Sequence, residues 1–178
     1  MVARRLTGVV LAVVLAVAGS AVAGCAAPGG GAGRGPAQGA APAATGPLLA
    51  FSATTLDGQP FDGMSLSGKP TVLWFWAPWC PICLQQAPGV RKAVTEYGDR
   101  VNIVGVAGLD KTDAMPEFVR LAKVQGMTHL ADEAGVVWKR FGITEQSIFV
   151  LLDADGSVVG KGRLAAGEIP DRVAELLS

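Results

Sequence analysis

The chain has 178 residues, of which 50% are hydrophobic and 17% are charged, and its 15 basic side chains equal its 15 acidic ones in number. This balance excludes the broad positive surface that a nucleic-acid-binding protein needs. Most of the excess glycine and alanine lies before residue 48, so residues 48–178 have the composition and length of one globular domain with a sizeable core.

The chain begins with the pattern of an export signal. Arg4 and Arg5 precede an apolar run, and small residues follow as far as Cys25. Residues 22–25 (VAGC) resemble a bacterial lipobox in which valine replaces the usual leucine. We therefore expect residues 1–25 to be a lipoprotein signal peptide, with Cys25 as the lipid-bearing residue that holds an exported protein at the outer face of the cell membrane.

Two alternatives for the N-terminus remain open. Residues 6–27 are long enough for an uncleaved membrane helix, although Gly19, Ser20 and Gly24 weaken it. A signal that is cleaved without lipidation would instead give a freely secreted product. The first alternative, like the lipoprotein, leaves the remainder of the chain exported and held at a membrane.

The segment after Cys25 has a composition typical of a linker. Residues 26–47 are mostly glycine, alanine and proline with one charge, at Arg34. Such a segment cannot bury enough apolar surface to fold. We expect a flexible linker at residues 26–47 and a single folded domain at residues 48–178.

Hydrophobic patterning in this domain predicts alternating strands and helices. Strands are expected at residues 48–53, around Phe61, and at residues 71–76, 101–107, 147–152 and 157–162; helices are expected at residues 80–97, 112–125 and 135–141, and as a last helix with Ile169, Val173, Leu176 and Leu177 on its core face. A buried strand joined through a helix to another buried strand predicts parallel pairing, whereas the last two strands form a hairpin. The expected fold is α/β, with a mixed central sheet, helices on both faces and an N-terminal β-hairpin extension.

Two cysteines lie at the junction between the strand at residues 71–76 and the following helix. Cys80 and Cys83 face each other across one helical turn, within reach of a disulfide bond. Cys80 stands where an N-cap would, and Pro81 suits the first helical position. The free amides of Ile82 and Cys83, with the positive end of the helix dipole, then favour a thiolate at Cys80. We expect an accessible Cys80 as nucleophile, and a more buried Cys83 of higher pKa that resolves the mixed disulfide.

Three other interpretations of the cysteine pair compete with the redox one. A zinc site needs two more ligands, and only His129 and the lipid-destined Cys25 are available. An inert structural disulfide would close a very small loop and stabilise little. A copper-delivery site is the third, because two thiols and a histidine bind soft metals.

The neighbouring aromatic residues and the single histidine carry weaker signals. Residues 74–76 (WFW) belong to a strand and are expected in the core. Trp79 precedes the nucleophile at a turn, where contact with substrate and simple packing are equally supported. His129 is expected at the surface or at a strand edge and not as a ligand.

The region around the cysteines resembles the thioredoxin superfamily. The resemblance rests on residues 74–83 (WFWAPWCPIC), with Pro88 five residues after the second cysteine. The lipobox, the N-terminal extension, residues 68–70 (GKP) and residues 153–156 (DADG) make the chain similar to the exported TlpA, ResA and DsbE branch, and most similar to actinobacterial DsbE and DsbF lipoproteins. The resemblance spans the whole expected domain and implies a thioredoxin-like fold, catalysis by Cys80 and Cys83 without a cofactor, and protein substrates.

The sequence departs from this family at the position of its usual cis-proline. Gln146 and Ser147 occupy that place, just before the strand that faces the active-site disulfide. A cis bond before serine costs about 3–4 kcal/mol, so we expect a trans bond here. We hypothesise that the Ser147 hydroxyl contacts the Cys80 sulfur instead.

The family's buried acids are also missing. Trp74 occupies the aspartate position and Gln86 the glutamate position. With no buried carboxylate to oppose it, a thiolate at Cys80 should form more readily. Because a stabilised reduced form makes a disulfide more oxidising, this difference favours an oxidase.

Several functions therefore remain to be distinguished. The preferred one is an oxidase that passes its disulfide to exported proteins and is reset by a membrane redox partner. A membrane-tethered reductase of the cytochrome c maturation type is the first alternative, and a copper-binding metallochaperone is an alternative of another class. A peroxidase is less well supported, because no threonine is placed to activate a peroxide beside Cys80.

Overall fold

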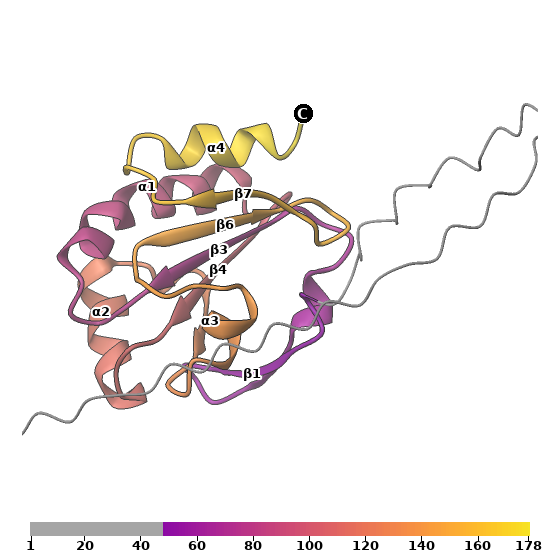
Figure 1. Ribbon diagram of the computed structural model, residues 1–178. Helices are drawn as coiled ribbons and strands as arrows, with labels where there is room; N and C mark the ends of the chain where they lie inside the picture. The colour runs from indigo at the N-terminus through magenta and orange to yellow at the C-terminus, as the bar shows by residue number, and fades with distance from the viewer. Residues whose placement is uncertain (1–47) are drawn as a thin grey trace, which may run out of the picture. The chain divides into compact units, whose positions relative to one another are not determined.

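A computed structural model describes residues 48–178 (Figure 1). The expected signal peptide at residues 1–25, its lipidated Cys25 and the linker at residues 26–47 lie outside the described residues. Within residues 48–178, no helix combines the length and the apolar character needed to cross a membrane.

The domain is built on one mixed sheet of seven strands in the order β2-β1-β5-β4-β3-β6-β7. The strands are β1 (Ser52–Thr55), β2 (Pro60–Asp62), β3 (Thr71–Trp76), β4 (Asn102–Ala107), β5 (Thr128–Ala131), β6 (Ile148–Leu152) and β7 (Val158–Gly162). Strands β3, β4 and β5 are parallel, and all other neighbours are antiparallel. The expected mixed sheet is confirmed, and the N-terminal hairpin joins it through the pairing of β1 with β5.

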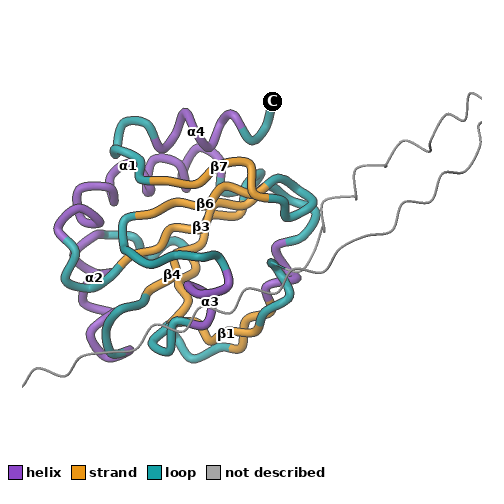
Figure 2. The backbone as a smooth tube through the Cα atoms, in the orientation of Figure 1, coloured by secondary structure: helices purple, strands orange, loops and turns teal. Residues whose placement is uncertain are grey.

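Helices cover both faces of the sheet, as expected (Figures 1 and 2). The helices are α1 (Pro81–Tyr97), α2 (Met115–Ala122), α3 (Val136–Arg140) and α4 (Ile169–Glu175), with short 3-10 turns at Gly63–Leu66 and Thr112–Ala114. Helices α1, α2 and α4 share one hydrophobic cluster with the sheet. Helix α3 and the segment before β1 contribute to the cluster on the other face.

Strand β3 lies inside the sheet, between β4 and β6, and contributes to both hydrophobic clusters. Its side chains alternate, so that Trp74 and Trp76 enter the cluster of α1 while Leu73 and Phe75 enter the cluster of α3. All four are fully buried, which confirms the core position expected for the aromatic run. Because β3 is paired on both sides and buried on both faces, its end is a rigid support for the loop that leads to α1.

Two expectations about residues 112–131 are wrong. Residues 128–131 form a strand that the sequence did not predict, and His129 within it is 5% exposed instead of lying at the surface or at a strand edge. The reason is that β5 is paired with both β4 and β1, so it lies inside the sheet. The preceding helix also ends earlier than residue 125, because Lys123 adopts a left-handed conformation with φ of 56°.

Candidate functional site

The cysteine pair lies where β3 passes into α1, and its local geometry is that of a capped helix. Cys80 is the N-cap of α1 and Pro81 is the first helical residue, as expected. The backbone N–H of Cys83 donates a hydrogen bond of 3.0 Å to the Cys80 sulfur. The first sulfur therefore lies at the positive end of the helix, where a negative charge is favoured.

Both sulfurs are buried, which differs in part from the expectation. Cys83 is 0% exposed and Cys80 only 1% exposed, so the expected accessibility of Cys80 is not found in this free-thiol form. Burial, followed by the hydrogen bond with Cys80, raises the pKa of the Cys83 thiol to about 12. Cys83 is therefore a protonated thiol at neutral pH, in line with the expectation of a high pKa for the second cysteine.

Exposed apolar side chains lie beside the buried Cys80. Trp79, immediately before Cys80, is 54% exposed, and Ile82 in the first helical turn is 37% exposed. The Trp79 indole N–H donates to the carbonyl oxygen of Leu109 at 3.3 Å, and the Leu109 side chain is itself exposed. We call Trp79, Ile82 and Leu109 the rim; these side chains need no core rearrangement to move.

Ser147 brings its hydroxyl to both cysteines. The Ser147 Oγ lies 3.1 Å from the Cys80 sulfur and 3.2 Å from the Cys83 sulfur, and the residue is fully buried. The contact with Cys80 is the one hypothesised from the sequence, whereas the contact with Cys83 was not foreseen. Every peptide bond in the described part of the chain is trans, including the one before Ser147.

The backbone of Ser147 is held from both sides. Its N–H donates to the carbonyl oxygen of Phe75 in β3 at 2.8 Å, and its φ of 70° is unusual for a residue other than glycine. Its carbonyl oxygen accepts a hydrogen bond of 3.0 Å from the Nε2 of Gln86 in α1. These two anchors fix the direction in which the hydroxyl points.

Both ends of the Gln86 side-chain amide are hydrogen-bonded. Besides the bond to Ser147, its Nε2 donates to the Leu164 carbonyl oxygen at 3.0 Å, and its Oε1 accepts from the indole N–H of Trp74 at 3.0 Å. Gln86 is 2% exposed. The two residues that replace the family's acids thus bond to each other, and within residues 48–178 the hydrogen-bond partners of this network include no carboxylate.

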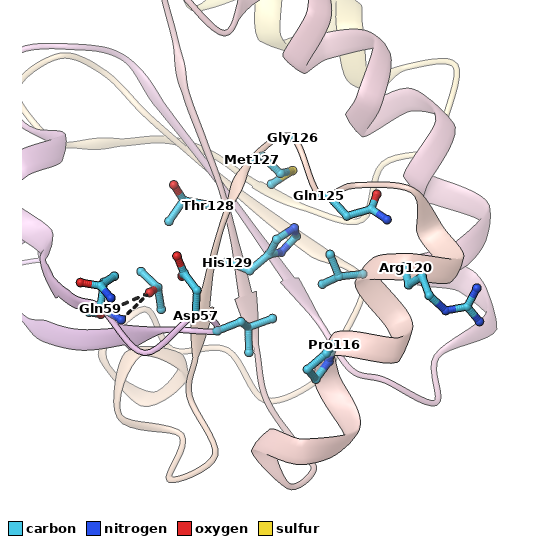
Figure 3. A pocket seen from close by; sticks show the side chains of 12 residues that line it. Asp57, Gln59, Pro116, Arg120, Gln125, Gly126, Met127, Thr128 and His129 are labelled. Atoms are coloured by element: carbon cyan, nitrogen blue, oxygen red, sulfur yellow. Dashed lines mark hydrogen bonds between the residues drawn. The ribbon is translucent and has the colours of Figure 1, made fainter.

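His129 lies in a different part of the domain. A cavity of about 810 Å³ is bordered by the β1–β2 turn, α2 and β5, with His129 at its wall and neither cysteine nor Ser147 among its lining residues (Figure 3). The His129 Nε2 contacts the Val124 carbonyl oxygen at 2.9 Å. In the described part of the chain, no group of three or more histidine, cysteine or acidic residues is arranged to hold a metal ion.

Comparisons with known proteins agree with this geometry. The model of the AhpC/TSA family matches residues 44–161. The soluble secreted antigen MPT53 of Mycobacterium tuberculosis is 42% identical over 134 residues, which cover 73% of this chain and 76% of that protein. The thiol-disulfide oxidoreductase ResA of Bacillus thuringiensis is 26% identical over 110 residues, which cover 61% of this chain and 63% of ResA.

Two solved structures of similar sequence also share the fold of this domain. The structure of MTB DsbF in mixed oxidized and reduced forms is 48% identical with a TM-score of 0.68, covering 72% of this chain and 96% of that chain. A secreted Mycobacterium tuberculosis disulfide oxidoreductase homologous to E. coli DsbE is 40% identical with a TM-score of 0.66, covering 72% of this chain and 97% of that chain.

Proposed function

Because the chain belongs to the AhpC/TSA family and is a thiol–disulfide oxidoreductase of the DsbE, DsbF and ResA type with a thioredoxin-like fold, we propose that it introduces disulfides into exported proteins through Cys80 and Cys83. The observation that carries this proposal is the surroundings of the Cys80 sulfur, which contacts the Cys83 N–H at 3.0 Å and the Ser147 hydroxyl at 3.1 Å. Two donors at a helix N-terminus favour the thiolate, which is the reactive form of cysteine.

The proposed reaction is a pair of thiol–disulfide exchanges. A substrate thiolate attacks the Cys80 sulfur of the Cys80–Cys83 disulfide, and Cys83 leaves. A second substrate thiolate then resolves the mixed disulfide and releases Cys80. Cys80 takes the first role because it borders the exposed rim, whereas Cys83 lies one turn deeper. The substrate reaches Cys80 by displacing rim side chains such as Trp79 and Ile82, which are already partly in solvent.

The direction of oxidation follows from the charge of the reduced state. Stabilising the Cys80 thiolate stabilises the reduced protein, and a stabilised reduced form makes the disulfide a stronger oxidant. Trp74 and Gln86, the residues at the family's acidic positions, introduce no negative charge that would oppose this thiolate. The balance therefore favours an oxidase over a reductase.

The reduction potential of the Cys80/Cys83 pair tests the direction. A value near or above about −180 mV supports the oxidase, whereas a value near or below about −270 mV identifies a reductase. Tight copper binding without any exchange with thiols would identify a metallochaperone instead. A Cys80 that iodoacetamide does not alkylate in the native protein would contradict its role as nucleophile.

Trapping identifies the substrates and the roles of the two cysteines. The Cys83→Ser variant lacks the thiol that would attack a mixed disulfide at Cys80, so proteins whose disulfides react with Cys80 should stay attached to it and be visible on non-reducing gels. The matched Cys80→Ser variant should trap none. Equal trapping by both variants would exclude the assigned roles.

The proposed location is outside the cytoplasm, with the domain tethered through lipid at Cys25. The lipobox at residues 22–25 supports this arrangement, as does the similarity to a secreted antigen. A signal peptide at residues 1–25, a linker at residues 26–47 and a domain at residues 48–178 would let the site act near the membrane, where a redox partner resets it. The Cys25→Ser variant should shed the domain from membranes with its exchange activity intact; retention on the membrane would indicate an uncleaved helix.

A further inference from the structure

The Ser147 hydroxyl lies within hydrogen-bond distance of both sulfurs that take part in the exchange. Its oxygen is almost equally distant from the two sulfurs, at 3.1 Å from Cys80 and 3.2 Å from Cys83. A hydroxyl has one hydrogen to donate, so it can donate to only one sulfur at a time. The two sulfurs, however, carry the negative charge in different steps.

We infer that the Ser147 hydroxyl serves both leaving sulfurs in turn, donating its hydrogen bond first to Cys83 and then to Cys80, and that Gln86 is the positioning residue that holds it there. This inference rests on the proposed function, because it concerns the two steps of the exchange at Cys80 and Cys83. Hydrogen bonds to a charged sulfur are stronger than those to a neutral thiol, so the hydroxyl is attracted to whichever sulfur is leaving.

The chemistry balances with the residues and substrate alone. In the first step a substrate thiolate forms a bond with Cys80, the Cys80–Cys83 bond breaks, and its electron pair stays on Cys83. The second substrate thiol loses its proton, which ends on Cys83. The second substrate thiolate then attacks the substrate sulfur that is bound to Cys80. The substrate disulfide forms, the bond to Cys80 breaks, and its electron pair stays on Cys80. The substrate is thereby oxidised by two electrons, and the cysteine pair is reduced by two.

A hydrogen-bond donor matters most in the first step, in which Cys83 leaves as a thiolate. Burial raises the pKa of the Cys83 thiol to about 12, so the departing Cys83 thiolate is strongly basic and poorly solvated. Within residues 48–178, the side-chain partner of Cys83 other than Cys80 is the Ser147 hydroxyl. The hydroxyl thus takes the part that a solvent molecule would play at an exposed sulfur.

Gln86 acts on this hydroxyl through the backbone. Its Nε2 fixes the Ser147 carbonyl oxygen at 3.0 Å, while the Trp74 indole N–H fixes the other end of the same amide. Ser147 has a φ of 70°, in the left-handed region that residues with a side chain seldom adopt. Without the bond from Gln86, only the N–H bond to Phe75 anchors this backbone, so the loop can relax from its conformation and carry the hydroxyl away from the sulfurs.

Separate measurement of the two half-reactions tests the inference. For the first, the oxidised protein is mixed with excess glutathione, and formation of the mixed disulfide is followed by mass spectrometry. For the second, the Cys83→Ala variant is loaded with glutathione at Cys80, and release of Cys80 by fresh glutathione is followed. The Ser147→Ala substitution should slow each half-reaction about tenfold or more, the loss expected for a hydrogen bond to a charged group.

The matched control is Thr71→Val. Thr71 has an equally buried hydroxyl at the opposite end of β3, where it bonds to backbone carbonyl oxygens far along the strand from the cysteines. Its substitution should change neither half-reaction. Slowing of only one half-reaction by Ser147→Ala, or of neither, overturns the inference while normal wild-type exchange leaves the proposed function standing. A wild-type disulfide that reacts with no thiol overturns both.

The role of Gln86 is tested by a double-mutant cycle. If Gln86 acts through Ser147, then Gln86→Leu slows both half-reactions, and adding it to Ser147→Ala causes no further slowing. Each substitution should also make the reduction potential of the pair more negative, which Thr71→Val should not do. Additive slowing, or an unchanged potential in Gln86→Leu protein that is still folded by circular dichroism, would exclude the positioning role.

Discussion

Two buried polar regions of the domain differ in how completely their hydrogen bonds are made. At the end of β3, the Gln86 amide donates to two carbonyl oxygens and accepts from Trp74, and the Ser147 hydroxyl touches both sulfurs. Around His129, the Nδ1 of that residue and the Nε1 of Trp76 are buried without a partner among the described residues. Both regions lie on the face of the sheet that α1 covers, and both are buried, with Gln86 2% and His129 5% exposed. The degree of burial therefore does not distinguish them.

The contrast shows which structural feature locates the chemistry. The cavity of about 810 Å³ adjoins His129 and not the cysteines. Thiol–disulfide exchange takes place at one sulfur atom, so the proposed reaction needs no enclosing pocket of this size. In this domain, the hydrogen bonds that meet at the Cys80 and Cys83 sulfurs support the proposed reactive centre better than the volume of a cavity does.

The largest expected effect is on activity at the redox end. Cys80→Ser should abolish thiol–disulfide exchange, because the substituted oxygen forms no disulfide. Stability should change little, since serine is itself a good N-cap and can accept the Cys83 N–H. Exchange assays with a dithiol and thermal unfolding of the same sample measure both quantities. Residual exchange in this variant would place the nucleophile elsewhere.

The next largest effect is on stability in the His129 region. A Cβ at residue 105 would lie 2.2 Å from the His129 Nδ1 and 2.8 Å from the Trp76 Nε1, so Gly105→Ala should lower the free energy of unfolding by about 1–3 kcal/mol. Denaturant titration measures this loss. Gly126→Ala is the matched control, because a Cβ there meets nothing within 4 Å. The folded Gly105→Ala protein should keep its exchange rate; a slowed exchange would show that the two regions are coupled.

The smallest expected effect is a pH dependence of stability. Burial lowers the pKa of His129 below its usual value of 6.5, so the folded protein resists a proton that the unfolded chain accepts. The free energy of unfolding should therefore fall as the pH drops below about 6.5, with a slope of at most about 1.4 kcal/mol per pH unit from this residue. Unfolding titrations between pH 7 and pH 5 measure it. His129→Leu should lack this component, and an identical slope in the variant would assign it to other groups.

The sequence predicted the parts of the fold that depend on local patterns. The apolar run of β3 and the Cys80-Pro81 start of α1 are strong local signals, and both elements form as expected. Strand β5 was missed because its four residues (THLA) begin with two polar side chains and lack alternation. Its burial comes from pairing with β1 and β4, which no local pattern encodes.

The site, like the fold, was predictable only where it depends on local sequence or on family resemblance. Cys80, Cys83 and the hydroxyl of Ser147 could be brought together from spacing and family resemblance. The bond from Gln86 to the Ser147 carbonyl could not, because it joins residues 61 positions apart whose contact depends on how α1 packs against the start of β6. The burial of Cys80 was also unforeseen, since the sequence does not show how neighbouring loops close over a sulfur.

The left-handed backbone at Ser147 limits which residues this loop accepts. Proline is restricted to φ near −65° and has no N–H, whereas Ser147 has a φ of 70° and donates its N–H to Phe75. The Ser147→Pro substitution would therefore be incompatible with the present loop and would not restore the arrangement that the family resemblance implies. A proline at this position would need a loop with a different backbone conformation, so a single substitution cannot introduce it without strain.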